Sequence, residues 1–159
     1  MTDEPTSIET TVEALAIDLA EIAAERAILA TLYRYGHSID YGLTDDWLDC
    51  FTADGAFDVR RRTGPVPSHR HEGREALEAF IAQHTHAPAH WHKHLLAEPV
   101  ITVVHHTASA RSYFTRLDAR DDGTPFIHAF GRYVDELAKG SDGVWRFTQR
   151  IAEVESFGG

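Results

Sequence analysis

Apolar residues follow a helical spacing through the first quarter of the chain. Residues 8–40 contain no proline, and their apolar positions recur mainly every three or four residues. This stripe consists of Leu15, Leu19, Ile22, Ile28, Leu32, Tyr35 and Ile39. The pattern predicts one long amphipathic helix, or two helices joined near residues 24–26.

Shorter elements are expected in the middle of the chain, where turn-forming residues interrupt the pattern. Thr44 is predicted to cap a second helix, because its hydroxyl can accept a hydrogen bond from a free backbone N–H. The predicted elements are that helix through Trp47 and Phe51 to residues 53–55, a strand over 56–62, a loop over 64–68 and a helix over 73–84.

After Pro88 the sequence changes to the composition of β-strands. Four runs rich in Val, Ile, Phe and Tyr cover residues 91–104, 108–117, 125–137 and 144–155. Turn-forming residues separate the last two pairs of runs, as expected for hairpins. Helices followed by a meandering antiparallel sheet predict an α+β fold rather than a doubly wound one.

Length and charge restrict the function classes. With 159 residues, the chain suits one domain over 8–159 behind a flexible leader at 1–7. Its net charge of −10 argues against binding to nucleic acid or an anionic membrane surface, and the basic run Arg60–Arg62 is too short to change that. The acidic N-terminus and the lack of a spanning apolar segment predict a cytoplasmic protein.

Several kinds of catalytic motif are missing from the sequence. It has no glycine-rich phosphate loop, no Gly-x-Ser-x-Gly elbow and no Cys-x-x-Cys pair. The single cysteine, Cys50, is expected to be a small buried hydrophobic residue. We therefore expect no cofactor and no nucleophilic catalysis.

Histidines are concentrated in one segment: five of the eleven lie between His84 and His94. On a strand, His90, His92 and His94 would share a face and could bind a transition metal. Same-face neighbours on one strand lie about 6.6 Å apart, which disfavours such a site. The alternative, a polar surface loop with only the last histidines reaching the interior, is preferred, and no metal is expected.

A metal-free site needs one histidine and one carboxylate. His94 precedes an apolar pair, and Asp40 ends an apolar helical stripe, where an unpaired carboxylate is costly. A carboxylate bonded to one imidazole nitrogen increases the basicity of the other, so the pair can act as a general base. Tyr35 could polarise a substrate carbonyl or protonate a leaving group. The structural alternatives are a buried ion pair and a core tyrosine without chemistry.

Other polar and aromatic residues are candidates for substrate contacts. Arg132 and Arg150 could receive a substrate carboxylate, although an ion pair is preferred for Arg132. His37 is expected to face solvent or a partner subunit. The candidate pocket walls, each equally explained as core, are Trp47, Phe51, Phe57, Tyr113 and Phe130.

Several local strings, in order and spacing, resemble the SnoaL-like branch of the nuclear transport factor 2-like superfamily. The matching strings are residues 32–40, Asp46–Phe57, Lys93–Leu96, Ala110–Phe114, Gly131–Asp135 and Asp142–Phe147 with Arg150. The resemblance implies a cone-shaped barrel, in which N-terminal helices wrap a curved antiparallel sheet with a deep apolar pocket.

The resemblance also implies roles for individual residues. In scytalone dehydratase, bile acid dehydratase and hexachlorocyclohexane dehydrochlorinase an Asp–His dyad matches Asp40 and His94. The bile acid enzyme has a tyrosine that matches Tyr35, and a pocket aromatic of the dehydrochlorinase matches Phe57. The second functional histidine of scytalone dehydratase has no counterpart, since Tyr113 and Leu117 lie in that neighbourhood.

The expected function is a cofactor-free lyase that eliminates water or halide from a small apolar ring-bearing substrate. A ketosteroid-isomerase-like or polyketide-cyclase-like isomerase is the alternative among enzymes. A noncatalytic dioxygenase β-type subunit is the alternative among scaffolds, and it predicts that His94 is not paired with Asp40. The superfamily commonly assembles as dimers or trimers, so a homo-oligomer is expected.

Overall fold

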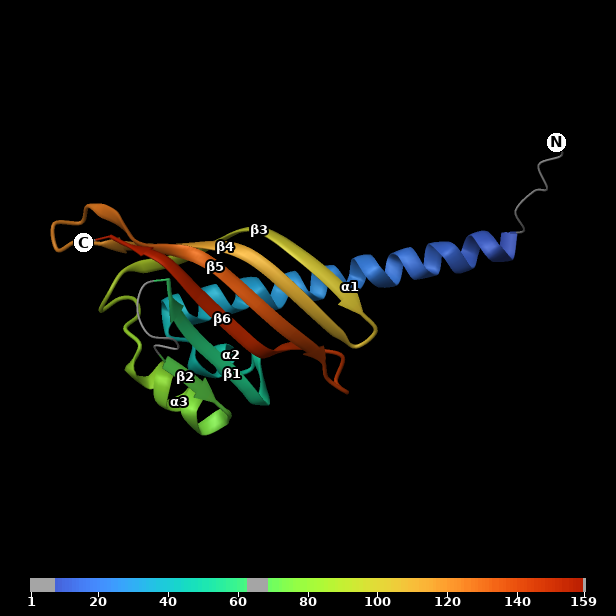
Figure 1. Cartoon of the computed structure of the whole chain (residues 1–159), viewed down its shortest axis with the longest axis horizontal. Coiled ribbons are helices and arrows are strands. Elements are labelled where there is room, and N and C mark those ends of the chain that lie inside the picture. The colour runs from blue at the N-terminus through green and yellow to red at the C-terminus, as the bar shows by residue number, and fades with distance from the viewer. Residues whose placement is uncertain (1–7, 63–68, 159) are drawn as a thin grey trace.

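The computed structural model describes residues 8–62 and 69–158, so the expected leader and the loop at 64–68 lie outside the described residues. The first element, α1 (Ile8–Tyr41), is one continuous helix. Its C-terminal half lies against the curved sheet, and its N-terminal half projects beyond the sheet (Figure 1). The apolar stripe is accordingly buried at Ile28 and Leu32 but exposed at Leu15 and Leu19.

A six-stranded sheet in the order β2-β1-β6-β5-β4-β3 forms the body of the protein. The remaining elements are α2 (Thr44–Leu48), β1 (Phe51–Arg61), β2 (His69–Glu72), α3 (Arg74–Gln83), β3 (His92–Val104), β4 (Thr107–Ala119), β5 (Pro125–Lys139) and β6 (Trp145–Phe157). All neighbouring strands are antiparallel except β1 and β6, which run parallel. This is the expected α+β architecture, with a curved sheet that does not close.

Two local predictions in the middle of the chain are wrong, and one strand was missed. The second helix ends at Leu48, and Phe51 begins β1, because its ladder pairing with Phe147 replaces helical hydrogen bonds. Leu43 rather than Thr44 occupies the N-cap, with no side-chain capping bond. The short strand β2 was not expected, since its four polar residues show no alternation; it forms by pairing with β1.

Aromatic side chains fill the space between α1 and the sheet. Tyr35 of α1 lies 5.8 Å from Trp47 and 6.2 Å from Phe57, measured between ring centroids. Trp47 and Phe51 pack at 4.9 Å, and both are buried. Burial of each such ring stabilises the fold by about 1.5–3 kcal/mol. The cluster fixes the C-terminal half of α1 against the strands.

A buried ion pair supports this cluster from the sheet side. Arg150 of β6 donates through Nε and Nη2 to the two carboxylate oxygens of Asp135 on β5, each at 2.9 Å. The guanidinium carbon also lies 4.1 Å from the ring centroid of Tyr35 and 3.9 Å from that of Tyr133. Arg150 is therefore a structural support that holds both tyrosine rings in place.

Among the described residues no helix combines the length and the apolar character needed to cross a membrane.

Candidate active site

Asp40 occupies the last turn of α1, directly against the start of β3. The residue is only 3% exposed. The close approach of the two elements depends on Gly36, one turn earlier, because a Cβ there would lie 3.3 Å from the carbonyl oxygen of His94. A larger residue at that position would push the strand away from the carboxylate.

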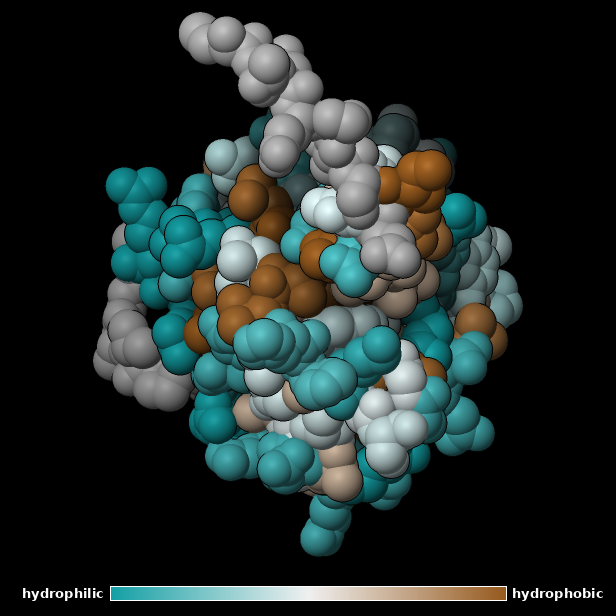
Figure 2. Space-filling view, turned by 90° about the vertical axis from the view of Figure 1, so that its right-hand side faces the viewer, coloured by the Kyte–Doolittle hydropathy of each residue, from teal (hydrophilic) through white to brown (hydrophobic). Residues whose placement is uncertain are grey.

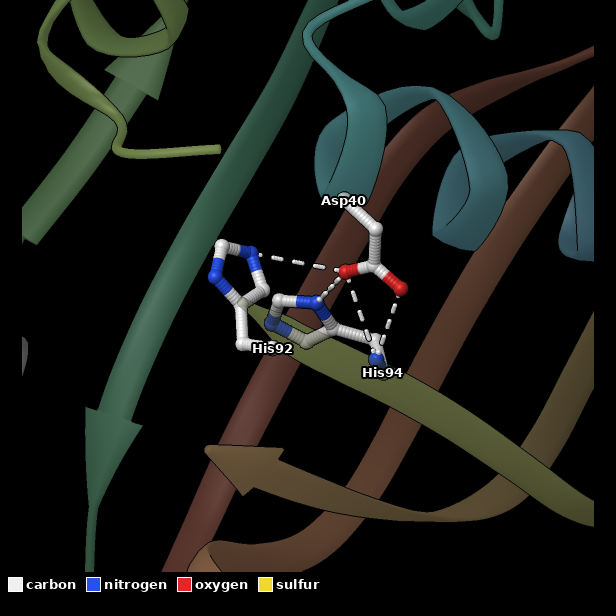
Figure 3. A group of neighbouring side chains, drawn as sticks. All are labelled: Asp40, His92 and His94. Atoms are coloured by element: carbon white, nitrogen blue, oxygen red, sulfur yellow. Dashed lines mark hydrogen bonds and ion pairs between the residues drawn. The ribbon is translucent and has the colours of Figure 1, made fainter. Parts of the chain in front are cut away.

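Asp40 and His94 form a tight pair. Nδ1 of His94 lies 2.6 Å from Oδ1 of Asp40, and the backbone N–H of His94 donates to Oδ2 at 3.0 Å (Figure 3). An ionised carboxylate only accepts hydrogen bonds, so Nδ1 is the donor in this contact, and a neutral ring then has its lone pair on Nε2. Nε2 makes no hydrogen bond within the described part of the chain. The arrangement is that of an oriented general base.

Two further imidazoles surround the pair. His92 lies with Nε2 3.5 Å from Oδ1 of Asp40, and its ring packs edge-on against His94 at 5.3 Å. His84, which follows α3, lies 5.3 Å from His92 and 6.0 Å from His94. Burial, reinforced by neighbouring positive groups, lowers the pKa of His92 to about 4 and that of His84 to about 3. Both are therefore neutral at neutral pH.

These neutral imidazoles make stability depend on pH. The unfolded chain binds protons at these sites near pH 6.5, whereas the folded protein binds them only near pH 4 and pH 3. The free energy of unfolding therefore has its full value above pH 6.5. It falls as the pH decreases, by up to about 1.4 kcal/mol per pH unit for each histidine. Urea unfolding at pH 7, 6, 5 and about 4.5 measures this slope.

The His92→Phe variant tests the assignment, because neither ring nitrogen of His92 has a hydrogen-bond partner. We expect the slope of its unfolding free energy against pH to be smaller, by the amount that corresponds to about one proton taken up on unfolding. His106→Gln, a change in the exposed turn between β3 and β4, should keep the wild-type slope. Equal slopes for wild type and His92→Phe would show that His92 is not held neutral.

A cavity of about 240 Å³ lies inside the curve of the sheet, with His94 in its wall. Its apolar surface includes Phe57, Phe80 and Phe114, and Tyr35 and Tyr133 also face it. A second hollow of about 290 Å³ lies between α1 and β3 and shares His94, Tyr35 and Tyr133 with the first. Apolar and aromatic residues make up a larger share of the lining of the inner cavity than of the outer hollow, as is typical of small-molecule sites.

The structure places the sequence-predicted residues in different environments. Tyr35 borders both hollows, Phe57 lines the inner cavity, and Arg150 borders the outer one. Burial raises the pKa of Tyr35 well above its ordinary value, so its hydroxyl stays protonated. Trp47 and Phe51 are buried core residues that line neither hollow.

Two of the expected pocket walls are wrong. Tyr113 is 59% exposed and Phe130 is 45% exposed, and both lie on the outer face of the sheet. Strand alternation turns the neighbouring Phe114 inward on β4, and on β5 it turns Ala129 and Gly131 inward beside Phe130. The ion pair preferred for Arg132 is present, with Glu153 as its partner. His37 is exposed and Cys50 is buried, as expected.

The set of residues that could hold a metal differs from the one expected. His90 bonds to Asp118 at 3.0 Å, and among the described residues the three side chains whose ligand atoms lie within 4.8 Å of one another are Asp40, His92 and His94. Two tetrahedral ligands of zinc lie about 3.3 Å apart. The 2.6 Å contact between Asp40 and His94 is therefore a hydrogen bond rather than a pair of ligand atoms in place.

Sequence reasoning missed the polar residues that neighbouring strands bring to the site. Arg116 of β4 pairs with His94 in the ladder, and His128 of β5 lies beside the same cavity. The only available signal was the alternation of β4 and β5, which puts Arg116 on the same face as Phe114.

Comparison with known proteins identifies the family of this chain. The family model of the SnoaL-like domain matches residues 20–151. The chain belongs to the SnoaL-like family. This SnoaL-like protein has no match among curated proteins. The family lies in a superfamily that includes polyketide cyclases, isomerases and dioxygenase β subunits, and its members are often enzymes.

Solved structures show the same fold. Rv3472 of Mycobacterium tuberculosis, a protein of unknown function, is 28% identical, with a TM-score of 0.75 over 89% of this chain and 76% of that one. The β subunit of a putative aromatic-ring-hydroxylating dioxygenase from Novosphingobium aromaticivorans is 25% identical, with a TM-score of 0.74 over 88% and 94%. ActVI-ORFA from Streptomyces coelicolor, 19% identical, shares the fold with a TM-score of 0.68 over 81% and 95%.

Proposed function

We propose that this SnoaL-like protein is a cofactor-independent lyase that acts on a small ring-bearing substrate by general base catalysis. The observation that carries the proposal is the 2.6 Å bond between Asp40 and Nδ1 of His94, beside an apolar cavity. A base oriented in this way, next to a bound carbon acid, supplies about 10²–10⁴-fold acceleration.

In the proposed reaction, Nε2 of His94 removes a proton from a substrate carbon. The electron pair of the broken C–H bond forms the new double bond, and hydroxide or halide leaves from the neighbouring carbon. Asp40 stabilises the imidazolium that forms. The Tyr35 hydroxyl, which burial keeps protonated, donates a hydrogen bond to the substrate carbonyl or leaving oxygen.

Isomerisation or cyclisation would begin with the same proton removal, so product analysis separates them from elimination. A noncatalytic β-type subunit is favoured by the similarity to the Novosphingobium protein. The scaffold function predicts that His94 is not paired with Asp40, whereas the two side chains are hydrogen-bonded. We therefore place the scaffold function second.

A probe substrate tests the base before the natural substrate is known. In 5-nitrobenzisoxazole, removal of the ring carbon proton breaks the N–O bond and releases a coloured nitrile phenolate. We expect saturable turnover that persists after treatment with a chelator. Turnover no faster than that of free imidazole, or turnover abolished by the chelator, would contradict the proposal.

We further propose that the protein is a homo-oligomer in which the projecting half of α1 packs against a second copy of the chain. Five of its exposed apolar residues are spaced alternately by four and three positions, as in a coiled-coil seam: Ile8, Val12, Leu15, Leu19 and Ile22. The exposed Ile17 lies off this seam. Hydrophobic side chains form patches on the end of the molecule from which this helix projects (Figure 2). A second copy offers a matching seam.

Charges placed on this seam should dissociate the oligomer. The double variant Leu15→Glu/Leu19→Glu is expected to elute as a monomer in light-scattering chromatography, since it buries two carboxylates in the interface. The matched variant Ala14→Glu/Ala20→Glu adds the same charge beside the seam and should keep the wild-type mass. A monomeric wild type, or an oligomeric seam variant, would refute this mode of assembly.

A further inference from the structure

The lining of the inner cavity contains basic side chains, although the protein as a whole is acidic. The net charge of the chain is −10, yet no Asp or Glu occurs among the described residues that line this cavity. Its polar lining consists instead of cationic and imidazole side chains: Arg61, Arg116, His84, His94 and His128. A neutral apolar ligand would not need such a lining, because burying cationic groups is costly.

Arg116 lies next to the proposed base. It is the direct ladder partner of His94, so the Cβ atoms of the two residues are about 5 Å apart on one face of the sheet. The side chain is 19% exposed. It donates through Nε and Nη2 to the two oxygens of Asp118, at 2.7 and 2.9 Å. Nη1 makes no hydrogen bond with any described residue and remains free for a ligand.

Asp118 contacts this group of basic side chains on the side away from the cavity. It is 4% exposed, accepts a hydrogen bond from His90 at 3.0 Å, and lies 3.6 Å from Nδ1 of His128. Burial alone would raise the pKa of Asp118, but hydrogen bonds from Arg116 and His90 lower it to about 2. The carboxylate thus stays charged and fixes the guanidinium at the cavity wall.

His128 reaches the cavity through an irregularity in the sheet. The β4–β5 register moves from Arg116 opposite Ala129 to Leu117 opposite Ile127, which leaves His128 with no ladder partner on β4. Such a bulge changes the direction of a side chain. The bulge and the Asp118 group together form a donor-rich side of a cavity whose remaining walls are aromatic.

We propose that this cavity recognises an anionic oxygen, of the carboxylate or phenolate class, on the ring-bearing substrate. Arg116 is the principal partner through its free Nη1, and Arg61 and His128 contribute from the same lining. Arginine suits this task because its planar guanidinium binds carboxylates with directed hydrogen bonds. The proposal rests on the proposed function, since it describes the substrate of that site and places the anion beside His94.

A matched pair of ligands tests the preference without any reaction. Calorimetric titration at about pH 7.5 should show that 2-naphthoate binds at least about tenfold more tightly than neutral, similarly shaped 2-naphthamide. In Arg116→Gln the ratio should fall to about twofold or less, through weaker naphthoate binding. Arg132→Gln removes an arginine from the outer face and should keep the wild-type ratio.

Equal affinities for the two ligands, or an unchanged ratio in Arg116→Gln, would overturn the proposal. If Arg116→Gln does not fold, a crystal structure of the wild type with 2-naphthoate decides instead: we expect the carboxylate within about 3.2 Å of Nη1 of Arg116. A carboxylate directed to solvent overturns the proposal. Binding involves no proton transfer, so this outcome is independent of whether Asp40 and His94 are needed for turnover.

Discussion

Replacement of His94 by Gln, or of Asp40 by Asn, is expected to lower kcat/KM for 5-nitrobenzisoxazole by about 10²–10⁴-fold. Gln removes the basic nitrogen while keeping polar contacts. Asn keeps the size of Asp40, but its amide cannot stabilise an imidazolium and can present a donor to Nδ1, which favours the wrong tautomer. Initial rates of phenolate release measure both effects.

The two residues should act as one unit. Because His94 is the base and Asp40 acts through it, the double variant should be about as slow as His94→Gln alone rather than showing the product of the two losses. His106→Gln removes a histidine from an exposed turn and should retain wild-type activity. A His94→Gln variant within threefold of wild type, on the scale of about 0.6 kcal/mol, would exclude His94 as the base.

The Asp135→Asn variant is expected to lose about 3–5 kcal/mol of unfolding free energy. Asp135 and Arg150 are both fully buried and bonded through two contacts of 2.9 Å. Asn removes the countercharge and leaves an uncompensated guanidinium among aromatic rings. Urea denaturation followed by circular dichroism measures the change.

An apolar double variant provides the control for this prediction. Asp135→Leu/Arg150→Met removes both charges at similar volume, so it should be markedly more stable than Asp135→Asn. Arg132→Met breaks an exposed pair with Glu153 and should cost no more than about 1 kcal/mol. An Asp135→Asn variant as stable as Arg132→Met would show that the buried pair does not support the core.

The regular elements were predictable because burial imposes a period on them. The stripe through Leu32 and Ile39 indicated α1, and runs rich in Val, Ile, Phe and Tyr indicated the four late strands. The start of β1 and the whole of β2 were not predictable, because both form through pairing with distant strands. Phe51 becomes a strand residue by pairing with Phe147, a contact that no local pattern encodes.

In the site, too, residues marked by local sequence were predictable, and residues placed by strand pairing were not. Asp40 and His94 were expected together because each combines a titratable group with an apolar neighbourhood. Arg116 was not, since its place beside His94 depends on the β3–β4 register. Tyr113 and Phe114 are adjacent aromatics, and the strand turns only one of them inward. A shift of one residue reverses that choice, which is why Tyr113 was assigned to the wrong face.

The protonation state of the His94 ring is the most direct test of the proposed base. A long-range proton–nitrogen NMR spectrum at about pH 7.5 should show a proton on Nδ1 and an unprotonated Nε2, whose signal moves when 2-naphthamide is added. The Asp40→Asn variant should lose this tautomer preference. A proton on Nε2 in the wild-type protein would contradict general base catalysis by His94, since no lone pair would then face the cavity.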